Sequence, residues 1–186
     1  MTRVLVLYGT SDGHTEDIVK ALCQAISENL PDSSMHCHAI ENAPSHLDGH
    51  DAVVVGSSIH MAKHHKEVVS WARSQQAALA RLPSAFFQVS LSSADEEHDA
   101  DARSYVDQFV EETGWHPDLV GLFGGALLYT RYGFAKKKLL KSIAKQGGLG
   151  TDTHRDYDYT DYDAVRHFGE DIARLVAAQG GTPGAG

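Results

Sequence analysis

The sequence predicts an α/β protein with a doubly wound, five-stranded parallel sheet in the order 2-1-3-4-5 and helices on both faces. Short apolar runs alternate with amphipathic segments along the chain, as in βαβ units. Residues 3–8 and 52–55 are apolar without alternation, which indicates strands buried on both faces. Right-handed crossovers between such strands place the helices on both sides. The 186 residues match one domain of roughly 100–200 residues.

The first half of the chain contains two helices and three strands by this interpretation. After the first strand, apolar residues recur at the spacing of one helix face. They are Ile18, Val19, Leu22, Ile26 and Leu30. Pro31 and Asp32 end this helix, and residues 35–40 are expected to form a short edge strand. The next strand, 52–55, ends at Gly56, and residues 64–81 are expected to form the second helix.

The second half continues the alternation and carries one longer segment. The expected elements are a strand at 85–91, a helix at 102–113, a strand at 119–127 and a helix at 163–178. We therefore predict one domain over residues 1–179, with an insertion at 128–160 between the last strand and the last helix. Residues 180–186 are rich in Gly and have nothing to bury, so we expect a disordered tail.

Composition and charge exclude several classes of protein. Lys and Arg total 16 against 25 Asp and Glu, a net charge of −9, which argues against a nucleic-acid partner. Cys23 and Cys37 are too few for a secreted disulfide scaffold. No apolar run approaches the roughly 20 residues of a membrane span, and the first strand leaves no room for a signal peptide. We expect a cytoplasmic protein.

The loop after the first strand has the composition of an anion site. Its hydroxyls and glycines stand at a helix N-terminus, where free N–H groups and the helix dipole favour a phosphate. The residues concerned are Thr10, Ser11, Asp12, Gly13, His14 and Thr15. The loop lacks the Lys of a Walker A motif and the GxGxxG spacing of dinucleotide-binding folds. A phosphomonoester is the expected ligand, and a simply capped helix is the alternative.

At this point the sequence resembles a family. Thr10, Asp12, Gly13 and Thr15 match T-x-[TD]-G-x-T, the FMN phosphate loop of flavodoxins. Further stretches resemble the bacterial flavodoxin-like, menaquinone-dependent protoporphyrinogen oxidases of haem synthesis. They are residues 55–65, 83–86, 89–91, 124–127, 129–132, 147–148, 151–153 and 159–161. The resemblance spans about residues 3–178 and implies a flavodoxin-like fold with FMN as cofactor.

Two further loops would hold the flavin ring. Ligands of doubly wound folds bind at the carboxyl ends of the strands, at the switch point. The loops that follow the third and fourth strands there contain Ser57, Ser58, Ile59 and His60, and Ser90, Leu91, Ser92 and Ser93. Their backbone N–H groups would bind the ring carbonyls and tune its potential. Simple turn formation is the alternative for these serines.

The same loops favour an enzyme over an electron carrier. No aromatic residue occurs at 57–63 or 91–104, whereas flavodoxins often stack the ring between aromatics there. The resemblance implies hydride transfer from a reduced porphyrin precursor to flavin N5 and reoxidation by a quinone. His60 is the candidate proton acceptor, with a plain surface histidine as the alternative. Arg131 is the candidate contact for porphyrin propionates, with a structural ion pair as the alternative.

The insertion contains a basic amphipathic segment that suits an anionic membrane. Lys137, Lys138, Lys141 and Lys145 can share one helix side. Leu139, Leu140 and Ile143 can share another. Such a helix can lie peripherally on the inner face of the cell membrane, near a lipid-soluble quinone. A helix packed on the domain with its lysines in water is the alternative.

Other functions remain open at this stage. The acidic charge also fits a flavodoxin-like electron carrier that docks basic redox partners. A quinone-linked dehydrogenase of another substrate is a third possibility. His36, Cys37 and His38, and the pair His64-His65, do not complete a zinc ligand set, so no metal is predicted.

Overall fold

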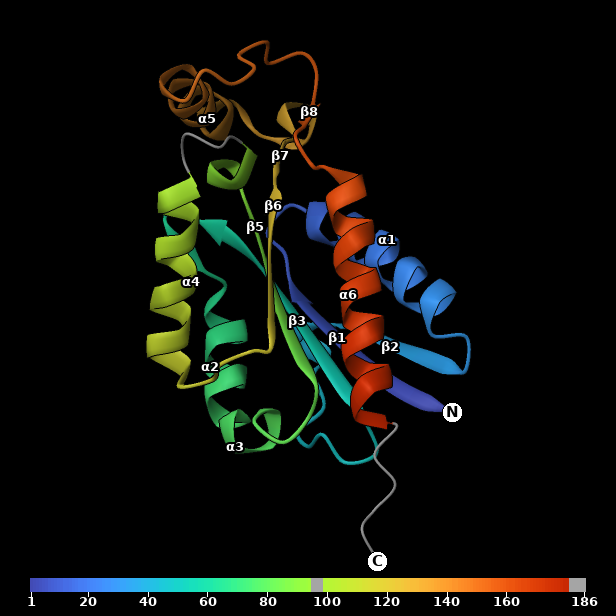
Figure 1. The fold of residues 1–186 in the computed structure, drawn as a ribbon. Helices are drawn as coiled ribbons and strands as arrows, with labels where there is room; N and C mark the ends of the chain where they lie inside the picture. Colours follow the sequence, from blue (N-terminus) through green and yellow to red (C-terminus); the bar gives the residue numbers. More distant parts are fainter. Residues whose placement is uncertain (95–98, 181–186) are drawn as a thin grey trace, which may run out of the picture.

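The computed structural model describes residues 1–94 and 99–180, and its central feature is a parallel sheet of order β2-β1-β3-β5-β6 (Figure 1). The five strands are β1 Thr2–Gly9, β2 Ser33–Ala39, β3 Ala52–His60, β5 Ser84–Ser90 and β6 Leu119–Gly124. All neighbouring pairs among them are parallel. Numbered among themselves, these strands have the order 2-1-3-4-5, so the predicted topology is confirmed.

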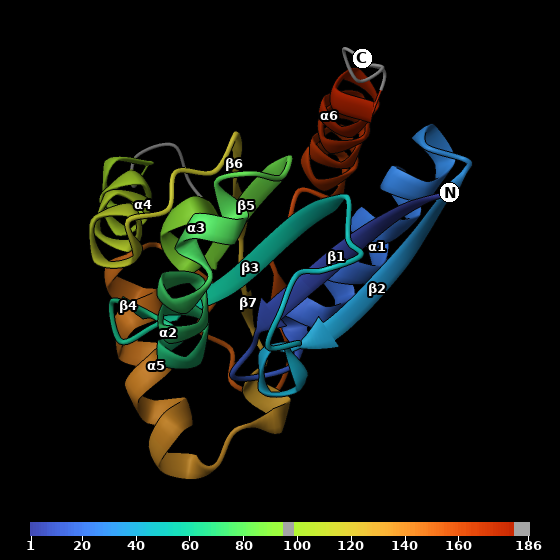
Figure 2. The same cartoon turned by 90° about the horizontal axis from the view of Figure 1, so that it is seen from below.

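Helices cover both faces of the sheet, as a doubly wound fold requires. The helices are α1 His14–Asn29, α2 Lys66–Ser74, α3 Gln76–Leu79, α4 Asp99–Thr113, α5 Phe134–Gln146 and α6 Tyr162–Gly180. Short 3₁₀ turns occur at Ile40–Asn42, Leu91–Ala94 and Tyr129–Arg131. The two views place α1 and α6 on one face and α2, α3 and α4 on the other (Figures 1 and 2).

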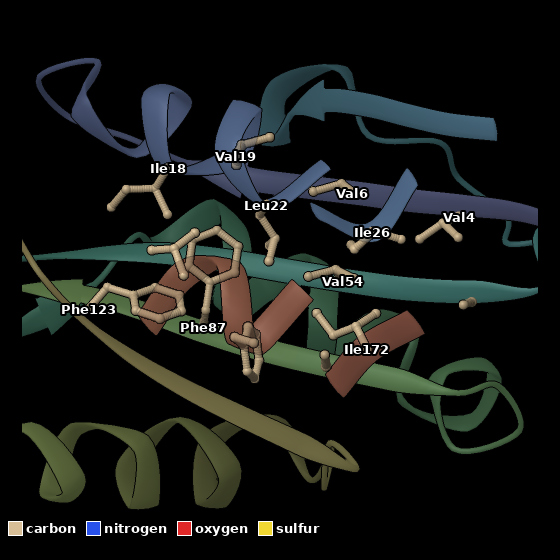
Figure 3. Close-up of a cluster of buried hydrophobic side chains, with 14 of the residues drawn as sticks. Val4, Val6, Ile18, Val19, Leu22, Ile26, Val54, Phe87, Phe123 and Ile172 are labelled. Carbon is tan, nitrogen blue, oxygen red and sulfur yellow. The ribbon is translucent and has the colours of Figure 1, made fainter. Parts of the chain in front are cut away.

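Each face of the sheet buries its own core, which explains why the strands read as unbroken apolar runs. Val4, Val6 and Val54 face α1 and α6 (Figure 3). Their strand neighbours Leu5 and Val53 lie in a second cluster, beneath α2 and α4. Because successive side chains point to opposite faces, one run of valines and leucines supplies both cores.

The predicted helix at 64–81 is wrong in its first residues and in its continuity. Lys63–His64 forms β4, which pairs antiparallel with the end of β3, and the helical part divides into α2 and α3. The hairpin turn is Met61-Ala62, with φ of 49° and 60°. Positive φ at both positions gives the twist that a two-residue hairpin needs, but the usual sequence signal for it is Asn-Gly. The turn therefore had no recognisable signature.

The predicted strand at 119–127 is also interrupted. Its last part is β7 Ala126–Leu127, which pairs with β8 Tyr157–Asp158 in a separate two-stranded sheet. The N–H of Gly125 donates to the carbonyl of Ser90, 3.0 Å away, where β6 gives way to β7. Long-range pairing with β8 is invisible to local apolar patterns.

The insertion packs as a small layer at one end of the sheet. Figure 1 shows α5, β7 and β8 beyond the end of the sheet at which α1 begins. A third apolar cluster holds this layer together; its buried members are Leu127, Leu128, Tyr129, Tyr132 and Ala144. Gly180 ends α6, and residues 181–186 lie outside the described residues, so the tail and the division at 179 stay predictions. Within residues 1–94 and 99–180, no helix has the length and apolar character needed to cross a membrane.

Candidate functional site

A cleft opens at the carboxyl ends of β1, β3 and β5 and is closed on one side by the insertion. The lining residues are Thr10, Ser11, Asp12, His14, Thr15, Ser58, Ile59, His60, Val89, Ser90, Leu91, Gly125, Ala126, Leu127, Tyr132, Lys136 and Leu140. The three predicted loops therefore meet in one cavity.

The loop between β1 and α1 is built to receive an anion. Gly13 has φ of 86°, a left-handed conformation that glycine adopts without strain, and its N–H donates to Thr10 Oγ1 at 3.0 Å. Helix α1 begins at His14, and the first N–H groups of a helix have no acceptor within it. Thr15 is buried and lines the cleft. Together these features are those that a phosphate site of neutral donors at the positive end of a helix dipole requires.

Two cationic side chains from the insertion reach this loop. Lys136 Nζ lies 2.6 Å from Asp12 Oδ1, and the Tyr132 hydroxyl donates to Asp12 Oδ2 at 2.9 Å. The Arg131 guanidinium donates to the Asp12 carbonyl at 3.3 Å, and an ideal Cβ on Gly13 would lie 3.5 Å from it. We call Asp12, Arg131, Tyr132 and Lys136 the clasp. The clasp fixes the insertion to the phosphate loop and neutralises the Asp12 carboxylate there.

Burial and the neighbouring Asp12 change the acidity of the Tyr132 hydroxyl. Desolvation, helped by the neighbouring Asp12 carboxylate, raises the pKa of Tyr132 above its usual value. The phenol therefore stays protonated and remains a donor to Asp12 across the physiological pH range.

His14 braces the loop from the other side. Its Nε2 lies 2.7 Å from Thr160 Oγ1, and the Thr160 hydroxyl donates onward to the Gly124 carbonyl at 2.8 Å. Because the hydroxyl proton is used in that second bond, His14 is the donor in the first. Its Nε2 is also 3.3 Å from Asp158 Oδ1. The His14 ring is thus engaged by residues at the end of the insertion, and its backbone N–H is what it offers to a ligand.

The prediction of a loop at residues 57–60 is wrong, because pairing with β5 and β4 extends β3 to His60, and its two serines have different tasks. The Ser57 hydroxyl accepts the N–H of His65 at 3.0 Å and donates to the Ser58 carbonyl at 3.3 Å, so it holds the β3–β4 hairpin. Ser58 Oγ is buried without a partner among the described residues, and the residue lines the cleft. A buried hydroxyl left unpaired at a cleft wall is the arrangement expected where a polar ligand atom completes the bond. Ile59 and the exposed His60 continue the lining.

Ser90, predicted in a loop, is the last residue of β5, and its hydroxyl holds the 3₁₀ turn that follows. Ser93 N–H donates to Ser90 Oγ at 3.1 Å, and the two hydroxyls are 2.7 Å apart. Ser90 and Leu91 line the cleft, whereas Ser92 and Ser93 do not. Leu91 also packs against the apolar cluster of the insertion, so this turn contacts the side of the cleft that the insertion forms.

Sequence reasoning missed the insertion side of the cleft. Gly13 and Ser57, both predicted to bind the cofactor, shape the loops without lining the cavity. The residues missed are Val89, Gly125, Ala126, Leu127, Tyr132, Lys136 and Leu140. Leu140, expected to share one apolar side of the helix with Leu139 and Ile143, faces the cleft because α5 packs on the domain through Leu140 and Ala144. The one feature of the sequence that pointed to these residues was the length of the insertion after the fifth strand.

Known proteins match both the sequence and this geometry. The flavodoxin domain model matches residues 5–154, which is most of the chain. The chain belongs to the flavodoxin-domain family. Two curated relatives are each 31% identical to it, and both are named protoporphyrinogen IX dehydrogenase [quinone]. The one from Leishmania major aligns over 95% of this chain and 77% of its own length; that from Escherichia coli K12 aligns over 94% and 96%.

Solved structures agree on the fold. Oxidised flavodoxin 1 from Bacillus cereus superposes with a TM-score of 0.56 at 13% identity, covering 93% of this chain and 98% of its own. The family member described here is an FMN-binding oxidoreductase, as the resemblance implied. The cleft fits that cofactor, because a neutral-donor loop at a helix N-terminus suits a phosphate and the unpaired Ser58 hydroxyl is free to bond a polar ligand atom.

Proposed function

We propose that this oxidoreductase converts protoporphyrinogen IX into protoporphyrin IX and passes the electrons to a quinone. The observation that carries the proposal is the near full-length similarity to two relatives that bear the name of this activity. The alignment extends past the flavodoxin core through the insertion, which forms a wall of the cleft. A simple fold likeness would not require that part of the chain to be similar.

The cleft offers what a bulky planar substrate needs. Bound FMN supplies two-electron chemistry, taking a hydride from a reduced substrate and giving the electrons to an acceptor. Ile59, near the end of β3, and Leu91, directly after β5, line the cavity. Neither side chain is an aromatic ring that would cover the flavin face. We propose that the phosphate loop anchors the phosphate, that Ser58 orients the ring, and that a ring face stays accessible to the porphyrinogen.

Two side chains are proposed to act on the substrate itself. His60 is exposed at the cleft wall, where its imidazole can accept the proton that accompanies hydride removal. Arg131 is exposed and stands beside the phosphate loop, so its guanidinium can serve the clasp and a propionate carboxylate at the rim. Replacing His60 by Gln is expected to lower kcat. Replacing Arg131 by Gln is expected to raise the substrate KM.

Anaerobic reduction of the FMN-loaded protein tests the proposal directly. Addition of protoporphyrinogen IX should bleach the oxidised-flavin absorbance, and a menaquinone analogue should then restore it. A protein that holds FMN but is not bleached by the porphyrinogen would refute the substrate. Bleaching without recovery by the quinone would refute the acceptor.

An electron carrier is the second candidate function, and the net charge of −9 favours it. Such a protein would be reduced by a basic redox partner and would ignore porphyrinogen. The same absorbance experiment therefore separates the two functions, and a third outcome, reduction by a different quinone-linked substrate, would identify another dehydrogenase.

We further propose that α5 contacts an anionic membrane surface peripherally. Residues 134–146 contain no acidic side chain, and Lys138, Lys141 and Lys145 are exposed. Phe134, Leu139 and Ile143 are also exposed, at 85%, 58% and 47%. Apolar side chains beside lysines on one exposed helix suit an interface between headgroups and acyl chains. Lys137, predicted to share that basic side, is half-buried.

Vesicle sedimentation tests this contact. The protein should bind vesicles rich in phosphatidylglycerol and not vesicles of phosphatidylcholine alone. Lys138→Glu combined with Lys141→Glu should abolish the binding, whereas Arg81→Glu, at an exposed position after α3, should leave most of it. Equal binding by all three proteins would refute a role for α5.

A further inference from the structure

We propose that Cys23 and Cys37 form a redox site, in which hydrogen peroxide oxidises the two thiols to a disulfide that joins α1 to β2. Both cysteines are free thiols in the structure. Their sulfur atoms are 2.9 Å apart, although the residues are separated by fourteen positions and lie in different elements. This proposal does not depend on the identity of the enzyme's substrate.

Regular packing, not a flexible loop, brings the two sulfur atoms together. Cys37 is in register with Val6 on the neighbouring strand, and Val6 lies in the core beneath α1. Parallel partners in register point to the same face, so Cys37 points toward α1. Cys23 follows Val19 by one helical turn and packs against the same core.

The separation is close to that of a bond. A disulfide has an S–S distance of about 2.05 Å, so the sulfur atoms must approach by about 0.9 Å. Because β2 is the edge strand of the sheet, it has a neighbour on one side only and can absorb such a shift.

The two thiols differ in the way that a reactive pair requires. Cys37 is exposed, whereas Cys23 is half-buried. A hydrogen bond from the Cys23 thiol lowers the pKa of Cys37, and the same bond together with burial raises the pKa of Cys23. A thiolate that is accessible and hydrogen-bonded is the form that attacks a peroxide, so Cys37 is the attacking residue and Cys23 the resolving one.

The reaction balances with peroxide as the sole oxidant. The Cys37 sulfur attacks one peroxide oxygen and the O–O bond breaks, which gives a sulfenic acid and one water. The Cys23 sulfur then attacks the Cys37 sulfur, the S–O bond breaks, and a second water leaves. Two thiols have lost two electrons and two protons, and one peroxide has become two waters. A dithiol reductant reverses the change.

Peroxide treatment of the FMN-loaded protein tests the site. Expected results are loss of both free thiols and a 23–37 cross-linked peptide on non-reducing digestion, both reversed by dithiothreitol. The new link closes a loop of about 15 residues, so Tm should rise by roughly 5–10 °C.

Single variants separate the two roles. In Cys23→Ser the Cys37 sulfenic acid should accumulate and be trapped by dimedone. In Cys37→Ser the remaining thiol should react at least about tenfold more slowly than Cys37 does in the wild type. Thiols that survive peroxide, a covalent dimer in place of the internal link, or equal rates in the two variants would each overturn the proposal.

Discussion

At the scale of single residues, the cleft depends on side chains that hold loops as much as on those that face the ligand. Ser57 illustrates the first kind, because both partners of its hydroxyl belong to its own hairpin. Ser58, the next residue, illustrates the second, with a buried hydroxyl left for a ligand. Adjacent and chemically identical residues thus have different tasks, which are set by the direction in which each side chain leaves the strand.

The Lys136–Asp12 pair gives a prediction at this scale. Lys136→Ala leaves the Asp12 carboxylate with less compensation beside the phosphate of FMN, so repulsion should weaken cofactor binding by about three- to tenfold. Fluorescence quenching of FMN by the apoprotein measures the Kd. Lys141→Ala, an exposed lysine on the same helix, is the control. Equal Kd values for wild type and Lys136→Ala would contradict a role for the clasp in cofactor binding.

Sequence patterns predicted the residues of the site where the chemistry is local. The phosphate loop is a contiguous run between a strand and a helix, so Thr10 and Thr15 could be identified from the sequence and do line the cleft. Tyr132 and Lys136 could not, because they reach Asp12 across 120 and 124 positions. The tertiary packing of the insertion decides which of its residues contact the phosphate loop, and the spacing of residues along the sequence does not reveal that packing.

At the scale of elements, the fold is held by close contacts between helices and strands that leave no space for larger side chains. Helices α1 and α6 meet at Gly169, where an added Cβ would lie 2.6 Å from the Ala25 Cβ and 3.2 Å from the Leu22 carbonyl oxygen. Glycine within a helix ordinarily costs stability relative to alanine. Here it permits the approach of α6 to α1 over the first core.

Gly169→Ala should therefore destabilise the protein, against the usual effect of this substitution in a helix. The contacts are with backbone and a short side chain that cannot move aside, so we expect a loss of about 1–3 kcal/mol in the free energy of unfolding. Urea denaturation measures it. Gly133→Ala, where an added Cβ meets nothing within 4 Å, should change stability little. A more stable Gly169→Ala protein would contradict the packing described for α1 and α6.

Element prediction succeeded where apolar periodicity was strong and failed at junctions. The five strands follow from runs such as 3–8 and 52–55, and their order is that of the doubly wound, flavodoxin-like fold that such strands resemble. The breaks after His60 and Gly124 did not follow, because a hairpin without Asn-Gly and a pairing of β7 with distant β8 carry no local apolar signal. Both junctions border the cleft, so the least predictable parts of the fold are the ones that shape the site.

At the scale of the whole molecule, buried ionisable groups connect stability to pH. His64 packs against the stacked rings of Phe86 and Phe109, with ring centroids 5.4 and 5.1 Å away, and its Nε2 donates to the Tyr105 carbonyl at 3.0 Å. Burial lowers the pKa of His64 to about 4 from its usual value of 6.5. The folded state therefore holds this imidazole neutral at pH values where the unfolded chain already binds a proton.

Stability should fall as the pH decreases through this window. The contribution of neutral His64 is complete above the unfolded pKa of 6.5 and is lost progressively down to the folded pKa of about 4. Between about pH 7.5 and about pH 5, the free energy of unfolding should drop by about 2 kcal/mol from this group. Urea denaturation of His64→Phe should show a shallower pH dependence, while His116→Gln, at an exposed position, should follow the wild type. Parallel curves for all three proteins would contradict the assignment.

The central claim is that the phosphate loop, the ends of β3 and β5 and the insertion together bind FMN. Titration of the apoprotein with FMN tests this claim most directly. The account predicts saturable quenching with one FMN per chain. It also predicts about tenfold weaker binding by Thr15→Val, which removes a hydroxyl at the cleft without changing shape. Thr2 lies at the start of β1, at the end opposite to the phosphate loop, so Thr2→Val should bind FMN as the wild type does. Absence of saturable binding, or equal affinity of Thr15→Val and wild type, would contradict the account.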